Sequence, residues 1–173
     1  MNKYKPVEIL CKVCYNLMHI TIRRYAFMSF IVEWAKTDIY PEFEQLQKRF
    51  KYLGAEEVRV DPSVTKELFE EYVANESMMA AYLDGSLIGY AFLDAFYDNQ
   101  EEVVCSIREI FVAPEYQRNG YGKEMVRKIR EEAKKIGAKK LLVFSVFIET
   151  DNFWMRSCGF EGDKSGYLVQ EIK

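Results

Sequence analysis

Apolar and polar residues recur along the first part of the chain with the periods of strands and helices. Residues 18–23 alternate between apolar and polar side chains and predict a first strand. Residues 29–53 predict two helices that meet near Pro41, because proline favours the first turn of a helix. The side chains that would share the apolar faces of these helices are Phe30, Ile31 and Trp34, then Phe43, Leu46 and Phe50.

A third helix and a hairpin are predicted to follow. Asp61 and Pro62 have the residue types of an N-cap and of a first helical position, and an apolar stripe at helical spacing comes after them. Residues 78–83 and 87–95 are apolar and predict two strands. The Asp-Gly pair between them is a strong signal for a tight turn, so the two strands are expected to form a hairpin.

The next part of the chain alternates between strands and helices. A polar turn at residues 98–102 precedes a long strand, 103–113, which Pro114 ends. The helix that follows has one apolar face and ends at Gly137. A nearly continuous apolar run then predicts a strand that is buried on both faces. The elements expected after Pro114 are a helix at 123–136, a strand at 141–147, a short helix at 152–157 and a strand at 167–172.

This order of elements predicts the class of fold. We expect a single mixed, mostly antiparallel central sheet with helices on both faces, within the α/β (α+β) class. Residues 1–17 have no strong period and are expected to form an N-terminal extension to one domain at residues 18–173. A related hypothesis is that translation begins at Met18. Such an architecture does not identify a function by itself.

Composition narrows the class of protein. The chain has 173 residues, of which 49% are hydrophobic and 29% charged, as in globular domains. A net charge of −3 and a pI of about 5.4 argue against a broadly basic surface for nucleic acid. No apolar run has the length of a membrane span, and the N-terminus lacks a signal-peptide pattern. We therefore expect a cytoplasmic protein without a nucleic-acid or membrane partner.

The cysteines raise the question of a metal site. Cys11 and Cys14 form a Cys-x-x-Cys pair, which is one half of a common zinc motif. The chain has four cysteines in all, a single histidine at His19 and no second Cys-x-x-Cys pair, so four zinc ligands are hard to assemble. We expect no metal and regard the thiols as ordinary small apolar residues.

A glycine-bearing loop lies between the strand 103–113 and the helix after it. From Gln117 to Gly122 it reads Gln-Arg-Asn-Gly-Tyr-Gly. The first N–H groups of a helix have no partner within the helix, and the helix dipole adds partial positive charge there, so this position favours a bound phosphate. The spacing matches neither the Gly-Lys-Ser/Thr phosphate loop nor the dinucleotide fingerprint. A nucleotide-binding domain is therefore disfavoured.

The context of this loop resembles a known family. A strand ending in Val-x-Pro-Glu-Tyr, then Gln-x-x-Gly-x-Gly, then an amphipathic helix is similar to the pyrophosphate-binding region of the GNAT N-acetyltransferase superfamily. The likeness extends over residues 78–160. It implies a GNAT-like acyl-CoA N-acyltransferase fold with acetyl-CoA as co-substrate. The implied function is transfer of the acetyl group to a primary amine of a small molecule or peptide, by direct attack in a ternary complex.

The resemblance also implies a set of cofactor contacts. Backbone N–H groups from Arg118 to Lys123 would hold the pyrophosphate, and the pantetheine arm would lie beside residues 110–113 like an added strand. Arg118 and Lys123, or else Arg127 and Lys128, would meet the 3′-phosphate, although a solvated helix face explains these cations equally well. The implied contacts are Phe111, Val112, Ala113, Gln117, Arg118, Asn119, Gly120, Tyr121, Gly122, Lys123 and Asn152.

Catalysis of this kind needs a base and a hydrogen-bond donor to the thioester carbonyl. The N–H of Phe111 or Val112 would stabilise negative charge on that oxygen, an effect of about 3–4 kcal/mol in comparable sites. Glu109 is the candidate general base, because its apolar neighbours would raise the pKa of its carboxyl group. The alternatives for Glu109 are an ion pair with Arg108 or a lysine, or simple exposure.

One departure from the family pattern concerns the general acid. Many members carry a tyrosine ahead of the terminal Gly-Phe to protonate the leaving thiolate, and Met155 occupies that position here. Methionine has no proton to donate, so Tyr121, Tyr167 or water would act, or no acid is needed. Met155 also leaves open a catalytically silent acyl-CoA-binding sensor or interaction module. Because edge strands of this architecture often pair between subunits, a homodimer is a further expectation.

Overall fold

The structure is a computed structural model, and it describes residues 29–51, 64–144, 150, 152–164 and 166–173. Several sequence-based expectations lie outside these residues. They are the N-terminal extension at 1–17, the strand at 18–23, the Cys11-x-x-Cys14 pair and the helix start at Asp61-Pro62.

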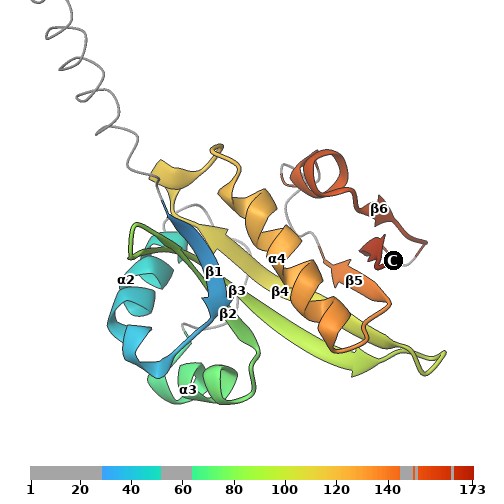
Figure 1. The fold of residues 1–173 in the computed structure, drawn as a ribbon, viewed down its shortest axis with the longest axis horizontal. Helices are drawn as coiled ribbons and strands as arrows, with labels where there is room; N and C mark the ends of the chain where they lie inside the picture. The colour runs from blue at the N-terminus through green and yellow to red at the C-terminus, as the bar shows by residue number, and fades with distance from the viewer. Residues whose placement is uncertain (1–28, 52–63, 145–149, 151, 165) are drawn as a thin grey trace, which may run out of the picture.

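The described residues form one mixed sheet of seven strands (Figure 1), which confirms the predicted fold class. The strand order is β1-β2-β3-β4-β5-β7-β6, and β4 and β5 are parallel while all other neighbouring pairs are antiparallel. The strands are β1 (Phe30–Trp34), β2 (Met78–Leu83), β3 (Ser86–Tyr97), β4 (Val103–Val112), β5 (Lys140–Val143), β6 (Glu161–Gly162) and β7 (Leu168–Glu171).

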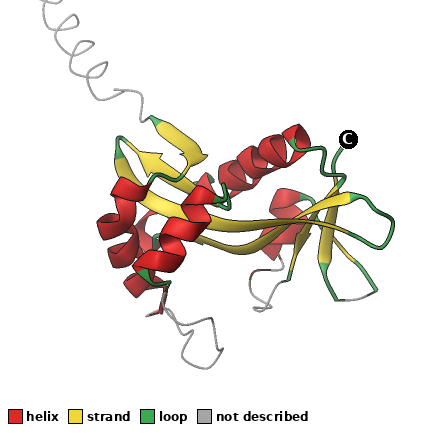
Figure 2. Ribbon diagram, turned by 90° about the horizontal axis from the view of Figure 1, so that it is seen from below, coloured by secondary structure: helices red, strands yellow, loops and turns green. Residues whose placement is uncertain are grey.

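Helices cover both faces of this sheet (Figure 2). Helices α2 (Tyr40–Lys51) and α3 (Lys66–Ala74) lie on one face, and α4 (Tyr121–Lys135) lies on the other. Their side chains divide the core into two clusters. The α4-face cluster includes Met125, Val126 and Ile129, whereas the α2/α3-face cluster includes Phe43, Phe69, Tyr90 and Phe111. Three short segments complete the description: η1 (Thr37–Ile39), η2 (Pro114–Tyr116) and the π-helical η3 (Phe153–Ser157).

The prediction of a helix from residue 29 was wrong. Phe30–Trp34 is the edge strand β1, which pairs antiparallel with β2. Phe30, Val32 and Trp34 alternate toward the α4-face cluster, with the period of a strand. Phe30, Ile31 and Trp34, the residues expected to share a helix face, fit helical spacing as well, and pairing with the available edge of β2 selected the strand. The helix expected after Pro41 is confirmed as α2.

Other boundaries differ by a few residues. Helix α3 begins at Lys66, and the Thr65 hydroxyl caps it by accepting a hydrogen bond from the Leu68 N–H at 3.3 Å. Helix α4 begins at Tyr121, two residues before the predicted start. The apolar run that begins at residue 141 lies in β5. The side chain of Leu142 in this strand is only half-buried, so the strand is not fully buried on both faces as predicted. The two-residue strand β6 was not predicted.

One irregularity in the sheet bears directly on the site. Strand β4 pairs with β3 along its length, but the register changes where Glu109 faces Phe92 and Ile107 faces Leu93. Arg108 is therefore an extra residue, and β4 carries a β-bulge there. On the opposite edge, the described part of β5 pairs with β4 only from Val104 to Ile107. Among the described residues, the end of β4 after the bulge thus has a strand neighbour on one side.

Candidate functional site

The end of β4 directs backbone groups toward this open edge. The Ala113 N–H donates to the Ile88 carbonyl of β3 at 2.8 Å. Because N–H groups alternate between the two edges of a strand, those of Phe111 and Ala113 face β3, and that of Val112 faces away from it. The carbonyl of Val112 faces the same way and accepts a hydrogen bond from Gln117 Nε2 at 2.8 Å. Gln117 thereby ties the start of the loop to the open edge.

Between β4 and α4 the chain makes a tight loop with two residues in the left-handed region. Arg118 has φ of 61°, and Gly120, the N-cap of α4, has φ of 87°. Glycine adopts this conformation without the steric cost that a Cβ imposes. Gly120 has no side chain to cap the helix, so the first-turn N–H groups of Tyr121, Gly122 and Lys123 remain available to an anion.

Hydrogen bonds within the loop hold its shape. Asn119 Nδ2 donates to the carbonyls of Tyr116 at 3.3 Å and Gln117 at 3.1 Å, so its side chain supports the turn. On the α2 side, Arg49 makes a two-pronged ion pair with Glu115 of η2. The hydrogen bond from Arg49 lowers the pKa of Glu115 below its ordinary value. Helix α2 therefore contacts the segment between β4 and the loop.

The first turn of α4 also packs closely against its surroundings. A Cβ on Gly89 of β3 would lie 2.5 Å from the Phe111 carbonyl oxygen and 3.4 Å from both Met125 Sδ and Val112 Cα. Helix α4 thus begins directly over the end of β4. A Cβ on Gly122 would meet the ring of Phe153 in η3 at 3.3 Å.

Segment η3 lies beside the start of α4 and contains one of the predicted contacts. Its residues Phe153–Ser157 form a π-turn, a feature frequent at functional sites. Asn152 immediately precedes this turn and is exposed. On α4, Arg130 donates to Gln170 of β7 at 2.7 Å and to the Cys158 carbonyl at 3.3 Å, which ties the end of η3 to the sheet.

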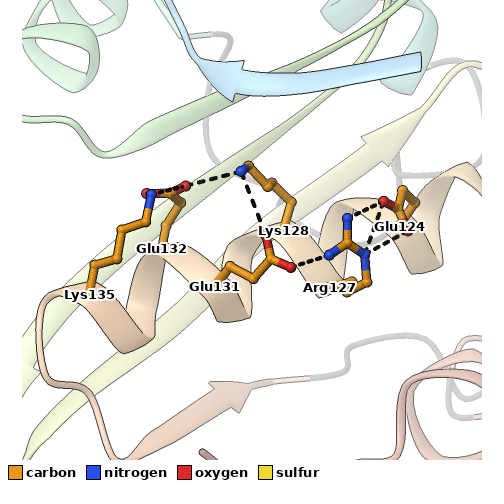
Figure 3. Close-up of polar contacts among 6 residues, drawn as sticks. All are labelled: Glu124, Arg127, Lys128, Glu131, Glu132 and Lys135. Carbon is orange, nitrogen blue, oxygen red and sulfur yellow. Dashed lines mark hydrogen bonds and ion pairs between the residues drawn. The ribbon is translucent and has the colours of Figure 1, made fainter. Parts of the chain in front are cut away.

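The basic residues considered for a phosphate contact fall into two groups. Arg127 and Lys128 are engaged along α4 with Glu124, Glu131 and Glu132 (Figure 3). These ion pairs between residues three and four positions apart are typical of a solvent-exposed helix face. Arg118 and Lys123 differ, since within the described residues neither makes a hydrogen bond or ion pair through its side chain.

Glu109 lies on the α2/α3 face of the sheet, immediately after the bulge. It is half-buried, and its Oε1 accepts a hydrogen bond from the Tyr90 hydroxyl at 2.5 Å. The neighbouring Arg108 makes an ion pair with Asp94 of β3 at 3.4 Å and reaches the Tyr72 hydroxyl of α3 at 3.4 Å. Sequence reasoning did not single out Tyr90, because an aromatic residue in an apolar strand has the pattern of an ordinary core residue.

Three residues concern the general acid, namely Met155, Tyr167 and Tyr121. Met155 is exposed in η3, at 48% of its possible surface. Tyr167 precedes β7, and its ring packs against Phe144 at a centroid distance of 5.6 Å. Tyr121, the other candidate, starts α4 and packs against Phe30 of β1 at 4.7 Å. The structure thus gives each candidate tyrosine an aromatic neighbour.

Within the described residues, no three His, Cys, Asp or Glu side chains are grouped in a way that would hold a metal ion. None of the helices in these ranges combines the length and apolar character needed to cross a bilayer.

Comparison with known proteins identifies the family. Residues 31–160 match the family model described as "Acetyltransferase (GNAT) family". This match covers most of the chain, and the chain belongs to the acetyltransferase (GNAT) family. The resemblance inferred from the Gln-x-x-Gly-x-Gly loop is confirmed.

Individual relatives are more distant. An amino-acid acetyltransferase of Aeromonas salmonicida (strain A449) is 32% identical over 78 residues, which are 45% of this chain and 16% of that protein. The chain therefore matches only about a sixth of the length of this curated relative.

Solved structures share the fold. N-acetylglutamate synthase from Neisseria gonorrhoeae, complexed with coenzyme A and N-acetyl-glutamate, has a TM-score of 0.66 at 20% identity, over 84% of this chain and 35% of that one. PaiA N-acetyltransferase from Thermoplasma acidophilum, in complex with coenzyme A, has a TM-score of 0.66 at 18% identity, over 84% and 99% of the two chains.

Proposed function

We propose that this chain is an N-acetyltransferase that moves the acetyl group of acetyl-CoA to a primary amine of a small molecule or peptide, by direct attack in a ternary complex. The observation that carries the proposal is a strand edge at Val112 that no described strand occupies, beside an uncapped helix N-terminus at Gly120. Membership of the family supports it, as do two structures of the same fold that hold coenzyme A.

The loop residues suit the anionic part of acetyl-CoA. The N–H groups of the first α4 turn and the helix dipole favour a pyrophosphate, and Gly120 places no side chain in the way. Arg118 and Lys123 are our choice for the 3′-phosphate, because Arg127 and Lys128 are already paired with carboxylates. Asn119 and Gln117 act indirectly, by holding the loop through backbone carbonyls.

The open edge of β4 suits the pantetheine arm. Acetyl-CoA supplies an acetyl group activated as a thioester, together with a thiol that leaves readily. Of the two N–H groups considered as donors to the thioester carbonyl, we choose that of Val112, because that of Phe111 faces β3 within the sheet. Because the N–H groups of Phe111 and Ala113 face β3, we assign the strand-edge contacts with the pantetheine arm to Ile110 and Val112 instead.

Glu109 is the proposed general base. Its carboxylate lies on the same strand as Val112, three residues earlier, and its half-buried position is accessible to an amine. It would accept the proton that the amine loses on attack. No side chain is assigned as the acid: Met155 has no proton to give, and Tyr121 and Tyr167 remain candidates alongside water.

Two measurements test the proposal. Acetyl-CoA is expected to raise the melting temperature, since a ligand that binds only the folded state stabilises it by mass action. An amine panel should then include one amine that releases free thiol, with amino acids first because of the amino-acid acetyltransferase relative. Stabilisation by ATP or NAD in place of acetyl-CoA would contradict the proposal. Stabilisation by acetyl-CoA without thiol release from any amine would favour the silent sensor that Met155 leaves open.

Replacing Glu109 by glutamine tests the base. Glu109→Gln is expected to lower kcat/KM by about 10²- to 10⁴-fold, the usual contribution of general base catalysis. The acid limb of the pH–rate profile should flatten, and the affinity for acetyl-CoA should not change. Glu161→Gln, an exposed glutamate of β6, is the matched control and should behave as wild type. An unaltered pH profile for Glu109→Gln removes Glu109 from the mechanism.

A further inference from the structure

The hydroxyl of Tyr90 makes a contact that the proposed mechanism does not use. Tyr90 lies on β3 and is 0% exposed, yet its hydroxyl reaches Glu109 Oε1 at 2.5 Å. A phenol that donates to a carboxylate makes a short, charge-assisted hydrogen bond, stronger than one between neutral groups. The contact therefore restrains the carboxylate of the proposed base.

The ring that carries this hydroxyl is itself held by other aromatic rings. Phe43 of α2 meets Tyr90 edge-on at a centroid distance of 5.0 Å, and Phe92 lies at 5.4 Å. On β4, Phe111 lies at 5.8 Å from it. A ring enclosed by three others has little freedom to rotate or shift, because interiors are packed as densely as organic crystals. The position of the hydroxyl is therefore set by the α2/α3-face cluster.

Tyr90 also keeps its proton. Burial raises the pKa of Tyr90 above its ordinary value of 10.0, and the negative charge and hydrogen bond of Glu109 raise it further. The hydroxyl therefore remains a donor throughout the pH range in which enzymes work. A permanent donor favours the ionised form of its carboxylate partner.

We propose that Tyr90 is a positioning residue for Glu109: its hydroxyl holds the carboxylate in the orientation, and in the ionised state, that base catalysis requires. This inference rests on the proposed function. It links α2 to the reaction, since Phe43 of α2 supports Tyr90 and Tyr90 supports Glu109.

Other ionisable groups face the same region and stay unchanged in the test. Arg108 of β4 is paired with Asp94 of β3, and its guanidinium also contacts the hydroxyl of Tyr72 on α3. Helix α2 contributes Tyr40, whose ring contacts Phe43. Because removal of the Tyr90 hydroxyl leaves each of these groups in place, a shift in titration is attributable to the lost hydrogen bond.

The first experiment is kinetic. Tyr90→Phe is expected to lower kcat by about ten- to a hundredfold, the usual cost of a poorly oriented catalytic group, with little change in the KM for acetyl-CoA. The acid limb of its pH–rate profile should move upward by about one pH unit. Tyr82→Phe is the matched control: it removes a hydroxyl from the same face of the sheet, on β2, and should leave both values unchanged.

A double variant separates positioning from a general structural role. If Tyr90 acts through Glu109, the loss caused by Tyr90→Phe should nearly disappear in a Glu109→Gln background. Equal losses in both backgrounds would overturn the proposal, since Tyr90 would then act independently of the carboxylate.

The second experiment does not depend on activity. Carbon-13 NMR of the labelled Glu109 carboxyl group should give a titration midpoint about one pH unit higher in Tyr90→Phe than in wild type. The same midpoint in both proteins would overturn the proposal. Should wild type release no thiol from any amine, the proposed function fails while this titration still decides whether Tyr90 controls Glu109. If Tyr90→Phe does not fold, a slowly exchanging hydroxyl proton in wild type that vanishes in Glu109→Ala supports the contact, and its absence from wild type contradicts it.

Discussion

Two glycines near the site are required for different physical reasons. Gly89 is required for space, because a Cβ there would lie 2.5 Å from the Phe111 carbonyl oxygen. Gly120 is required for conformation, since its φ is 87° while no atom of the described residues lies within 4 Å of a Cβ built on it. A substitution at Gly120 therefore tests the shape of the loop without introducing a clash.

Gly120→Ala is expected to destabilise the protein by about 1–2 kcal/mol, the cost of a Cβ in the left-handed region. It should also weaken acetyl-CoA binding by about three- to tenfold, because relief of the strain turns the first N–H groups of α4 away from the pyrophosphate. Urea unfolding and calorimetric titration with acetyl-CoA measure the two effects.

Gly137 provides the control at the other end of the same helix. Its φ is 81°, and it too has open space around a built Cβ. Gly137→Ala should cost similar stability and leave acetyl-CoA affinity unchanged. Equal losses of affinity in the two variants would show that the loop conformation at Gly120 has no special role.

At the scale of elements, the turn between β3 and β4 depends on one carboxylate. Asp98 accepts hydrogen bonds from the N–H groups of Gln100 at 2.8 Å and Glu102 at 3.0 Å, and from Lys140 Nζ at 3.3 Å. These hydrogen bonds lower the pKa of Asp98 below its ordinary value of 3.8. The bond from the Glu102 N–H has the largest effect, followed by the bond from the Gln100 N–H. The turn is therefore stabilised by the ionised form.

The lowered pKa of Asp98 determines how the stability of the protein changes with pH. A carboxyl group whose pKa is lower in the folded state stabilises the protein above its ordinary pKa and loses that effect as the pH falls through the folded-state value. Asp98→Asn should lower the melting temperature by a few degrees at pH 7, and the difference from wild type should shrink as the pH falls below 3.8 and disappear once the pH lies below the folded-state pKa. Scanning calorimetry between pH 7 and pH 2.5 measures it, with Glu101→Gln in the same turn as control. A difference at pH 2.5 as large as that at pH 7 would exclude the charge as its cause.

At the scale of the whole molecule, the sheet separates two clusters with different tasks. The α4-face cluster packs the helix that begins at the glycine loop, and the α2/α3-face cluster packs Tyr90 behind Glu109. Phe43 connects α2 to the rest of the second cluster. Its ring stacks on Phe69 of α3 at 5.0 Å and meets Phe92 of β3 edge-on at 5.9 Å.

Phe43→Ala is expected to destabilise the protein by about 3–5 kcal/mol, because the ring is fully buried and its removal leaves a cavity among aromatic neighbours. Urea unfolding gives the difference in free energy. The control is Phe96→Ala, at a position on β3 that is 43% exposed, which should cost about 1 kcal/mol or less. A small effect at Phe43 would mean that α2 is not held by this cluster.

Much of this architecture was accessible from the sequence because it depends on local patterns. The Asp84-Gly85 turn, the strands beside it, the amphipathic helix α4 and the glycine loop are each specified by residues within a few positions of one another. The prediction failed at β1, since Phe30–Trp34 fits two periods and only pairing with β2, more than forty residues later, selected the strand.

By itself, then, the sequence determined the order of most elements, the class of sheet and the glycine-bearing loop that precedes α4, since helix periodicity and glycine conformation are short-range properties. Tertiary structure alone decided which edge of β4 the Val112 N–H faces, how Arg49 meets Glu115 across 66 residues, and that Tyr90 donates to Glu109 across 19. Such contacts depend on register and on the packing of distant segments, which no local pattern records.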